Sequence, residues 1–391
     1  MIIKYSDRKI PITVMSIYVV NPGDTLDQIA ALYGADPLSI SYDNQIPYPY
    51  SLTPGEALYI GDQNPAEPSQ REIRTGGYAY PFISRYVLQQ TLPWLSDLYI
   101  FSYGFTEEGD LVFPNLPDGW MISLAKEYGT APILTLAPFG PDGRFNNYLI
   151  SRIVQQKDSR DRLIGQIRDQ IIDRGFEGVD IDFEYILAED RDGFTDFVRE
   201  VRSAVGELGF PVSVALAPKT SADQQGLLYE GKDYPALGAA ADYVLLMTYE
   251  WGYTYGPPMA VAPIRNVRQV VEYALTEIPA KKINMGIPNY GYDWPLPFIK
   301  GETRAMTLGS IEARQRAVQY GVPIRFDQTA ASPSYTYRLA SGEHEVWFED
   351  VRSLEAKFSL IREFGLGGAG YWNIMNLFRA NWLLLDSFFS G

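Results

Sequence analysis

The feature of this sequence that most constrains its fold is a repeated alternation of apolar strand patterns with amphipathic helical patterns, which begins near residue 76. Strands that alternate with helices pair in parallel, and eight such strands close into a barrel. The predicted strands cover residues 77–82, 97–103, 131–137, 178–184, 211–217, 242–249, 281–287 and 368–373, and the clearest helices cover 160–174, 191–207, 263–278 and 350–363. We therefore expect an α/β fold, a (β/α)8 TIM barrel over residues 75–391.

The stretch 293–349 interrupts this alternation between the seventh and eighth predicted strands. Tyr335–Tyr337 and Glu345–Trp347 have the composition of strands. We expect a small inserted α+β subdomain there. The single histidine of the chain, His344, follows a polar turn sequence, and we expect it to be a surface residue.

A smaller unit precedes the barrel. Residues 16–61 contain a strand pattern over 17–20, a helix that Asp24 or Thr25 can cap, a second helix over 38–42, and a strand pattern over 57–60. This order predicts a small βααβ domain. Residues 62–74 contain two Xaa-Pro pairs and are expected to form a linker.

The composition excludes several classes of chemistry. The chain has no Cys and one His, so thiol nucleophiles, disulfides and zinc sites with several His ligands are not available. Its net charge is -15 and no Lys/Arg-rich run occurs, so nucleic acid is not an expected partner. The 28 Tyr residues would suit a sugar site, although most are expected to pack in the core.

The first 20 residues contain no apolar segment of the length that a secretory signal requires, and no run of ~20 apolar residues follows. We therefore expect no membrane insertion and see no signal peptide. Either such a signal has been removed, or the protein reaches its wall from inside the cell that makes it.

One predicted strand carries three alternating carboxylates. Asp180, Asp182 and Glu184 share one face of the strand over 178–184, because residues at i, i+2 and i+4 point the same way. Helical patterns on both sides make this an interior parallel strand, where carboxylates are costly to bury and repel one another. Such an arrangement favours an acid that stays protonated near neutral pH. Glu184 lies at the carboxyl end, where barrel enzymes place their active sites.

The run from Glu177 to Glu184 resembles the DGxDxDxE signature of glycoside hydrolase family 18, with Glu177 in place of the first Asp. Met247-Thr248-Tyr249-Glu250 resembles the family's Met-x-Tyr-Asp, and Pro288–Trp294 resembles its PxYGRxW run with Tyr292 where Arg is usual. Gly370-Tyr371-Trp372 resembles the last strand, whose Trp supports the sugar. The third strand ends in Ala137-Pro138 and not in the usual Ser-x-Gly-Gly.

The resemblance implies a retaining, substrate-assisted glycosidase that needs no cofactor and no metal. By this resemblance, Glu184 is the acid and base, Asp182 accepts the acetamido N–H of the substrate, Asp180 shares a proton with Asp182, and Tyr249 donates to the acetamido oxygen. The residues it implies for substrate binding are Trp372, Met247, Glu250, Tyr290, Tyr292 and Tyr80.

Residues 16–60 resemble a LysM module, a domain that binds N-acetylglucosamine runs. Three stretches carry the likeness: Gly23–Leu26, Asn44–Ile46 and Leu52–Gly55. The glycan-binding residues that it implies are Gly23, Asp24, Thr25, Asn44 and Ile46. A LysM module before such a barrel is similar to the spore germination and cortex-lytic glycosidases of endospore-forming bacteria.

This combination implies an N-acetylglucosaminidase that acts on peptidoglycan in the cell wall, spore cortex or coat, with a glycan as its partner. We expect a monomer. Two alternatives stay open: a chitinase or chitobiose-cleaving endoglycosidase, which the departures at Ala137-Pro138 and Tyr292 disfavour, and a non-catalytic chitinase-like lectin, which the presence of Glu184 disfavours. Gly365–Gly370 fits G-x-G-x-x-G but follows a helix and enters a strand, the wrong context for a dinucleotide site.

Overall fold

A computed structural model of the chain describes residues 15–61 and 73–389. Most of the predicted linker, residues 62–72, lies outside the described residues. Arg74 already begins the first barrel strand, one residue before the predicted boundary. Within the two described ranges, no helix is long and apolar enough to cross a membrane.

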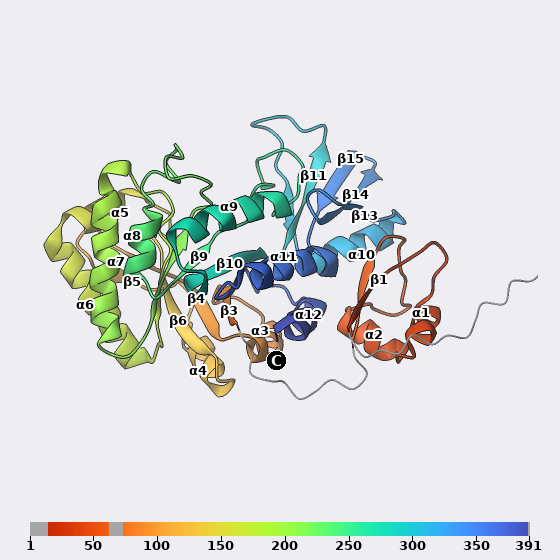
Figure 1. The fold of residues 1–391 in the computed structure, drawn as a ribbon, viewed down its shortest axis with the longest axis horizontal. Coiled ribbons are helices and arrows are strands. Elements are labelled where there is room, and N and C mark those ends of the chain that lie inside the picture. Colours follow the sequence, from red (N-terminus) through yellow and green to blue (C-terminus); the bar gives the residue numbers. More distant parts are fainter. Residues whose placement is uncertain (1–14, 62–72, 390–391) are drawn as a thin grey trace, which may run out of the picture.

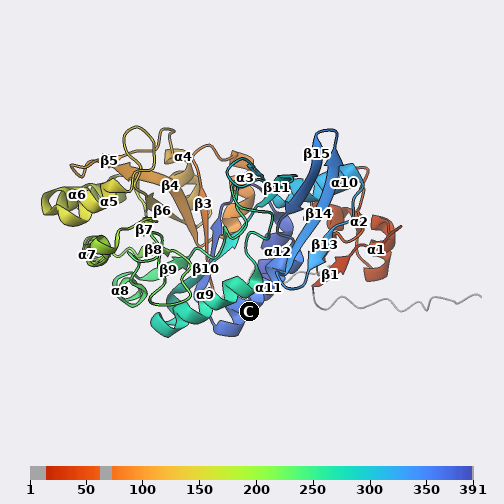
Figure 2. The ribbon, with the colours of Figure 1, turned by 90° about the horizontal axis from the view of Figure 1, so that it is seen from above.

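Eight parallel strands close into the expected barrel (Figures 1 and 2). Each pairs with the next, and the last strand returns to pair with the first. The barrel strands are β3 (Arg74–Ala79), β4 (Asp97–Phe105), β6 (Ala131–Leu136), β7 (Val179–Ile181), β8 (Val212–Leu216), β9 (Tyr243–Leu246), β10 (Ile283–Pro288) and β16 (Gly368–Trp372). The two-residue strand β5 (Leu111–Val112) adds an antiparallel edge to β4.

Three of these strands end three residues before their predicted ends, among them β9, which was predicted over 242–249 and ends at Leu246. The first strand runs over 74–79 and not 77–82; Pro81, which has no N–H to donate, follows shortly after its end. The strand with the carboxylates was predicted over 178–184, but its ladder to both neighbours ends at Ile181. Asp182 keeps one more backbone bond, from its N–H to the carbonyl of Leu136 at 2.9 Å, and the chain then leaves the sheet.

Helices surround the barrel and bury their apolar faces against it, as the amphipathic patterns predict. Long helix α7 shows the principle, because its buried residues Phe194, Phe197, Val198, Val201 and Val205 repeat at helical spacing. The outer elements are α3 (Arg85–Thr91), η1 (Leu92–Trp94), α4 (Gly119–Glu127), α5 (Tyr148–Gln155), α6 (Lys157–Arg174), η2 (Ala188–Asp190), α7 (Arg191–Gly206), α8 (Tyr234–Ala240), α9 (Ile264–Glu277), η3 (Ala280–Lys282), α11 (Val351–Phe364) and α12 (Arg379–Phe389).

Between β10 and β16 the chain forms a second sheet with its own helix and its own apolar core. The five strands are antiparallel, in the order β12-β11-β15-β14-β13. The elements are β11 (Gly291–Leu296), β12 (Met306–Leu308), α10 (Ser310–Tyr320), β13 (Arg325–Asp327), β14 (Ser332–Leu339) and β15 (Gly342–Trp347).

The expectation that His344 is a surface residue is wrong. His344 lies within β15, where its side chain is largely buried and its Nδ1 lies 2.8 Å from Oδ1 of Asp293. The polar turn that suggested exposure ends at Gly342, so His344 is already part of the strand, opposite Tyr337. Asp293 also accepts from the Tyr337 hydroxyl at 2.6 Å and from the Arg316 guanidinium. These bonds connect strands and helix within the inserted subdomain.

The N-terminal unit contains β1 (Ser16–Val19), α1 (Leu26–Tyr33), α2 (Pro37–Asp43) and β2 (Ala57–Ile60). β1 and β2 pair antiparallel, and the two helices lie between them in sequence. Thr25 caps α1 in a reciprocal arrangement with Gln28, and Gly34 ends that helix at a φ of 66°. Its small core is separate from that of the barrel.

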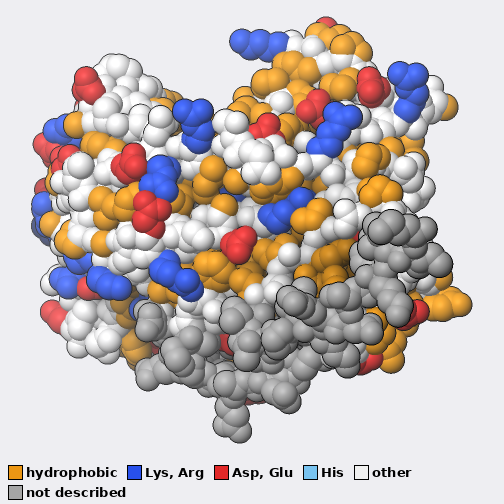
Figure 3. Space-filling model, turned by 45° about the vertical axis from the view of Figure 1, so that its right-hand side comes forward, with side chains coloured by type: hydrophobic (Ala, Val, Ile, Leu, Met, Phe, Trp, Pro, Cys, Tyr) orange, Lys and Arg blue, Asp and Glu red, His pale blue; other side chains and the backbone are white. Residues whose placement is uncertain are grey.

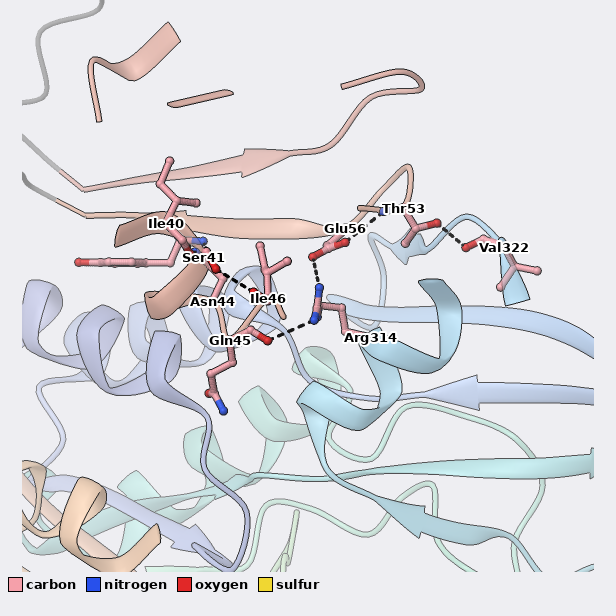
Figure 4. Close-up of polar contacts among 10 residues, drawn as sticks. Ile40, Ser41, Asn44, Gln45, Ile46, Thr53, Glu56, Arg314 and Val322 are labelled. Atoms are coloured by element: carbon pink, nitrogen blue, oxygen red, sulfur yellow. Dashed lines mark hydrogen bonds and ion pairs between the residues drawn. The ribbon is translucent and has the colours of Figure 1, made fainter. Parts of the chain in front are cut away.

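This unit is fixed to the rest of the chain by a close polar interface (Figure 4). Arg314 of α10 donates to Oε1 of Glu56 at 2.9 Å and to the carbonyl of Gln45 at 3.3 Å. The Thr53 hydroxyl donates to the carbonyl of Val322 at 2.7 Å. At Gly55, with φ of 82°, a Cβ would lie 1.8 Å from the carbonyl oxygen of Ile324. The interface therefore requires a glycine where the two backbones meet.

Charged side chains are spread over the described surface that Figure 3 shows. Lys and Arg side chains alternate there with acidic and apolar ones and do not form a continuous basic stripe among the described residues.

Candidate active site

The three carboxylates of β7 and its continuation lie at the carboxyl end of the barrel, in different surroundings. Asp180 is fully buried, and its two oxygens accept from the Tyr78 hydroxyl at 2.8 Å and the Ser213 hydroxyl at 2.6 Å. Tyr78 comes from β3 and Ser213 from β8, so Asp180 connects three strands. Burial raises the pKa of Asp180 to about 6, although these two hydrogen bonds oppose the shift.

Asp182 is buried but incompletely satisfied. Its Oδ1 has no hydrogen-bond partner among the described residues. Burial, followed by the charges of Glu184 and Asp180, raises the pKa of Asp182 well above its ordinary value. A buried acceptor without a partner costs free energy. This atom is therefore available to accept from a bound substrate.

Glu184 lies farther out, half-buried, and burial raises its pKa as well. Asp182 and Glu184 both line a cavity of about 680 Å³. A carboxyl with a raised pKa at the wall of a cavity can hold a proton near neutral pH and deliver it to a ligand. The three groups titrate as one cluster because their charges interact.

The segment after β9 supplies another wall of this cavity. Met247, Tyr249, Glu250 and Trp251 all line it. Burial, followed by the charges of Asp182 and Glu184, raises the pKa of Tyr249 well above its ordinary value. Its hydroxyl therefore stays a hydrogen-bond donor throughout the working pH range.

Glu250 has a strained backbone, with φ of 69°, in the region that only glycine adopts freely. Its carboxylate accepts from the Tyr290 hydroxyl and from the Tyr292 hydroxyl, the latter at 2.9 and 3.1 Å. Strain of this kind, held in place by surrounding bonds, is common at functional sites. It aims the residue toward the cavity.

Tyr290 and Tyr292, which the resemblance implies for substrate binding, lie behind the wall of the cavity. Both rings are buried, and neither lines the cavity. They stand behind Glu250 because β11 turns away from the barrel into the second sheet. Their hydroxyls hold Glu250.

Aromatic rings close the remaining side. Trp372, at the end of β16, lines the cavity beside Tyr78, with ring centroids 5.6 Å apart. The ring centroids of Tyr80 and Trp372 are 6.1 Å apart, and the Tyr80 ring stacks on Phe82. Tyr80 lines a separate cavity of about 260 Å³. Tyr80 follows the end of β3 at Ala79, and its role in substrate binding stays a prediction.

The residues predicted to bind glycan in the N-terminal unit separate into two groups. Gly23, Asp24 and Thr25 lie in the β1–α1 loop; Gly23 and Thr25 are exposed and Asp24 is half-buried. Asn44 and Ile46 are buried: the Asn44 amide bonds the backbone of Ile40 and Tyr59, and Ile46 packs in the core. The side chains of these two residues build the unit itself, and their contact with glycan stays a prediction.

Several residues of the site carried no signal that the sequence analysis used. Tyr78 and Ser213 hold Asp180, and Tyr185, Tyr229 and Tyr253 line the cavity. A serine inside an otherwise apolar strand was a signal that could have identified Ser213. No comparable cue in the sequence indicates that Lys232 is buried.

Comparisons with known proteins agree with this geometry. A sequence profile described as Glycosyl hydrolases family 18 matches residues 139–376. The Cortical fragment-lytic enzyme of Bacillus subtilis (strain 168) is 40% identical, covering 96% of this chain and 98% of that protein. The crystal structure of the Bacillus cereus spore cortex-lytic enzyme SleL is 32% identical, with a TM-score of 0.91 over 96% of this chain and 98% of that one.

A more distant structure, a chitinase from Chromobacterium violaceum, is 24% identical, with a TM-score of 0.75 over 81% of this chain and 98% of that one. At this identity the likeness concerns the fold alone.

Proposed function

This chain belongs to glycosyl hydrolase family 18, and on that premise we propose that it hydrolyses the β-1,4 bonds that follow N-acetylglucosamine in spore cortex peptidoglycan. It is a glycoside hydrolase. The name of its Bacillus subtilis relative, which spans nearly the whole chain, supports the choice of cortex as substrate. The observation that carries the mechanism is the unpartnered Oδ1 of Asp182 in the same cavity as Glu184.

In the proposed first step, the Glu184 carboxyl gives its proton to the glycosidic oxygen as the bond from C1 to that oxygen breaks. The acetamido oxygen of the same sugar bonds to C1 and forms a cyclic oxazolinium ion. Oδ1 of Asp182 accepts the acetamido N–H and stabilises its growing positive charge. The Tyr249 hydroxyl donates to the acetamido oxygen and holds it for attack, while Trp372 packs against the sugar ring.

In the second step, the Glu184 carboxylate takes a proton from water, and the water oxygen bonds to C1 as the oxazolinium ring opens. Each of the two steps inverts the configuration at C1, so the product keeps the β configuration of the substrate. This route needs no protein nucleophile, which distinguishes it from the retaining glycosidases that place two carboxyl groups ~5–5.5 Å apart.

The test of this route is a thiazoline analogue of N-acetylglucosamine, which mimics the cyclic ion. It should inhibit competitively. Mass spectrometry of the enzyme quenched during turnover should find no sugar ester on Asp or Glu. A covalent sugar ester on either residue type would refute the route.

The bond that is cut can be tested separately. Digested cortex is reduced with borohydride and hydrolysed, and the reduced sugars are identified. Cleavage after N-acetylglucosamine yields glucosaminitol. Muraminitol as the main product, or digestion of chitin without action on cortex, would overturn the proposed substrate.

We further propose that residues 16–61 are a LysM module that binds the same glycan through the β1–α1 loop. Asp24 shapes this loop by accepting from the Tyr18 hydroxyl and the Asn21 N–H, both at 2.7 Å. Asp24→Ala should weaken sedimentation with insoluble cortex by roughly fivefold, the effect of about 1 kcal/mol. Asp27→Ala, an exposed carboxylate on the neighbouring helix, is the matched control. Equal binding by both variants would remove the loop from the proposed glycan site.

A further inference from the structure

The segment that joins β8 to α8 contains a lysine that is almost completely buried. Lys232 is 1% exposed. Lysine is rarely buried to this extent unless its ammonium group is paired, because removing the charge from water is costly. The neighbouring Gly231 lets this segment approach closely, since a Cβ there would lie 2.4 Å from the carbonyl oxygen of Ile186. The segment is thereby pressed against the chain that follows β7.

The Lys232 ammonium joins the two strands at the point where they separate. The ladder between β7 and β8 ends at the pair of Ile181 and Val214. Just beyond it, Nζ donates to the carbonyl of Phe183 and, at 3.0 Å, to the carbonyl of Ala215. The ammonium thus connects two carbonyls beyond the last ladder pair. Because Phe183 lies between Asp182 and Glu184, this bond fixes the backbone that carries both carboxylates.

The same ammonium faces the carboxylate cluster. Burial raises the pKa of each carboxyl, and the Lys232 charge opposes that rise in Asp180, Asp182 and Glu184. Burial lowers the pKa of Lys232 to about 8, against the attraction of the same three carboxylates. The Phe194 ring of α7 completes the enclosure, with its centroid 5.2 Å from Nζ. Other titratable groups around the cluster are Tyr78 and Tyr80 of the β3 segment, Asp97 and Tyr99 of β4, Tyr185 beyond β7, Tyr243 of β9, and Tyr249 and Glu250 beyond β9. Lys219 and Asp233 lie beside Lys232 in the β8–α8 segment, where the charge that acts most on Lys219 is that of Asp233.

We propose that Lys232 is a positioning residue of this glycosidase, which aims Glu184 through the Phe183 carbonyl and sets the pH range in which the carboxylate cluster is active. The inference rests on the proposed function, because it assigns the acid to Glu184. Lys232 touches no substrate in this role. It acts through the backbone of Phe183 and through its charge.

The test compares pH profiles of kcat/KM on soluble cortex fragments. Lys232→Met removes the charge, so the carboxyls become harder to ionise and both limbs of the profile should move to higher pH by about one unit. Loss of positioning should lower kcat roughly 10- to 100-fold, with less effect on KM. Lys232→Gln keeps an N–H donor and should show the same shift with a smaller loss of kcat.

Lys219→Met is the matched control. Lys219 is 4% exposed, lies in the same segment, and donates to the carbonyls of Ala222 and Lys232, both at 3.1 Å. Its substitution should leave both limbs in place, even where stability falls. Limbs that stay unmoved in folded Lys232→Met and Lys232→Gln would overturn the proposal. Failure of both to fold, with Lys219→Met folded, would also overturn it by assigning Lys232 to stability alone. Retained activity in Glu184→Gln would instead refute the assignment of the acid.

Discussion

Two buried clusters of charge in this protein differ in how well they are balanced. At the barrel mouth, three carboxylates face one ammonium group, and Oδ1 of Asp182 has no partner among the described residues. At the interface of the N-terminal unit, one carboxylate meets one guanidinium: Glu56 is 1% exposed, and its two oxygens accept from Arg314 at 2.9 Å and the Thr53 N–H at 3.1 Å.

This difference distinguishes the carboxylates at the barrel mouth, which have a chemical role, from the pair at the interface, which has a structural one. At the barrel mouth, burial raises the pKa of each carboxyl, the charges of Glu184 and Asp180 add to the rise in Asp182, and one acceptor is left open. These features cost stability. The pair of Glu56 and Arg314 sets one buried carboxylate against one guanidinium and fixes the relative position of two parts of the chain. Imbalance therefore identifies the catalytic cluster better than burial does, because both clusters are buried.

The largest expected effect comes from removing the acid. Glu184→Gln should lower turnover of cortex fragments by ~10²–10⁴-fold, because the amide cannot transfer a proton. The thermal midpoint should change little, since the two side chains have nearly the same shape. Release of reducing sugar measures the first and circular dichroism the second. Activity near that of the unsubstituted enzyme would show that the proton comes from another group.

Substitutions at the interface should change the free energy of unfolding and not the rate of cleavage. Arg314→Met leaves Glu56 buried without its cation and should reduce the free energy of unfolding by about 3 kcal/mol in chemical denaturation. Glu56→Gln combined with Arg314→Met removes both charges and should recover part of that loss. Both variants should cleave short soluble fragments at the rate of the parent enzyme. A large fall in kcat for either one would make the interface part of the active site.

Tyr249→Phe tests a smaller contribution at the barrel mouth. The hydroxyl is proposed to donate to the acetamido oxygen and hold it in position for attack on C1, so its loss should cost about 1.5–2.5 kcal/mol, or roughly 10- to 70-fold in kcat. The KM should change less than kcat, because the hydroxyl positions the reacting oxygen for attack on C1 more than it holds the substrate. Tyr253→Phe, another tyrosine of the cavity wall, is the control. Equal effects of the two substitutions would contradict a specific role for Tyr249.

The smallest expected effect is a gain in stability. Burial raises the pKa of Asp182, so its protonated form stabilises the fold below the ordinary carboxyl pKa, and that stability is lost as pH rises through the folded-state value. Asp182→Asn cannot ionise and should exceed the parent enzyme by about 1 kcal/mol at pH 8, with little difference at pH 4. Denaturation at the two pH values measures this, with the exposed Asp192→Asn as control. A difference independent of pH would show that the raised pKa does not act on stability.

The sequence was most informative where a single segment carries the signal. Alternation of apolar strands with helices predicted the eight-stranded barrel, and the spacing of Asp180, Asp182 and Glu184 placed three carboxylates on one face at its carboxyl end. The N-terminal elements followed from local cues such as the Thr25 cap and Gly34. These features depend on backbone geometry within a few residues, and the sequence specifies that geometry directly.

The tertiary structure decided which side chains meet. The hydroxyls of Tyr78 and Ser213 reach Asp180 from strands 102 and 33 residues away, and Lys232 reaches Phe183 across 49 residues. Asn44 has the residue type of a ligand-binding group, yet its amide is used by the backbone of its own unit. A local pattern fixes the face on which a residue lies, but its partner depends on how the closed barrel and the packed second sheet bring distant segments together. That is why the sequence alone identified the three carboxylates but not the lysine beside them.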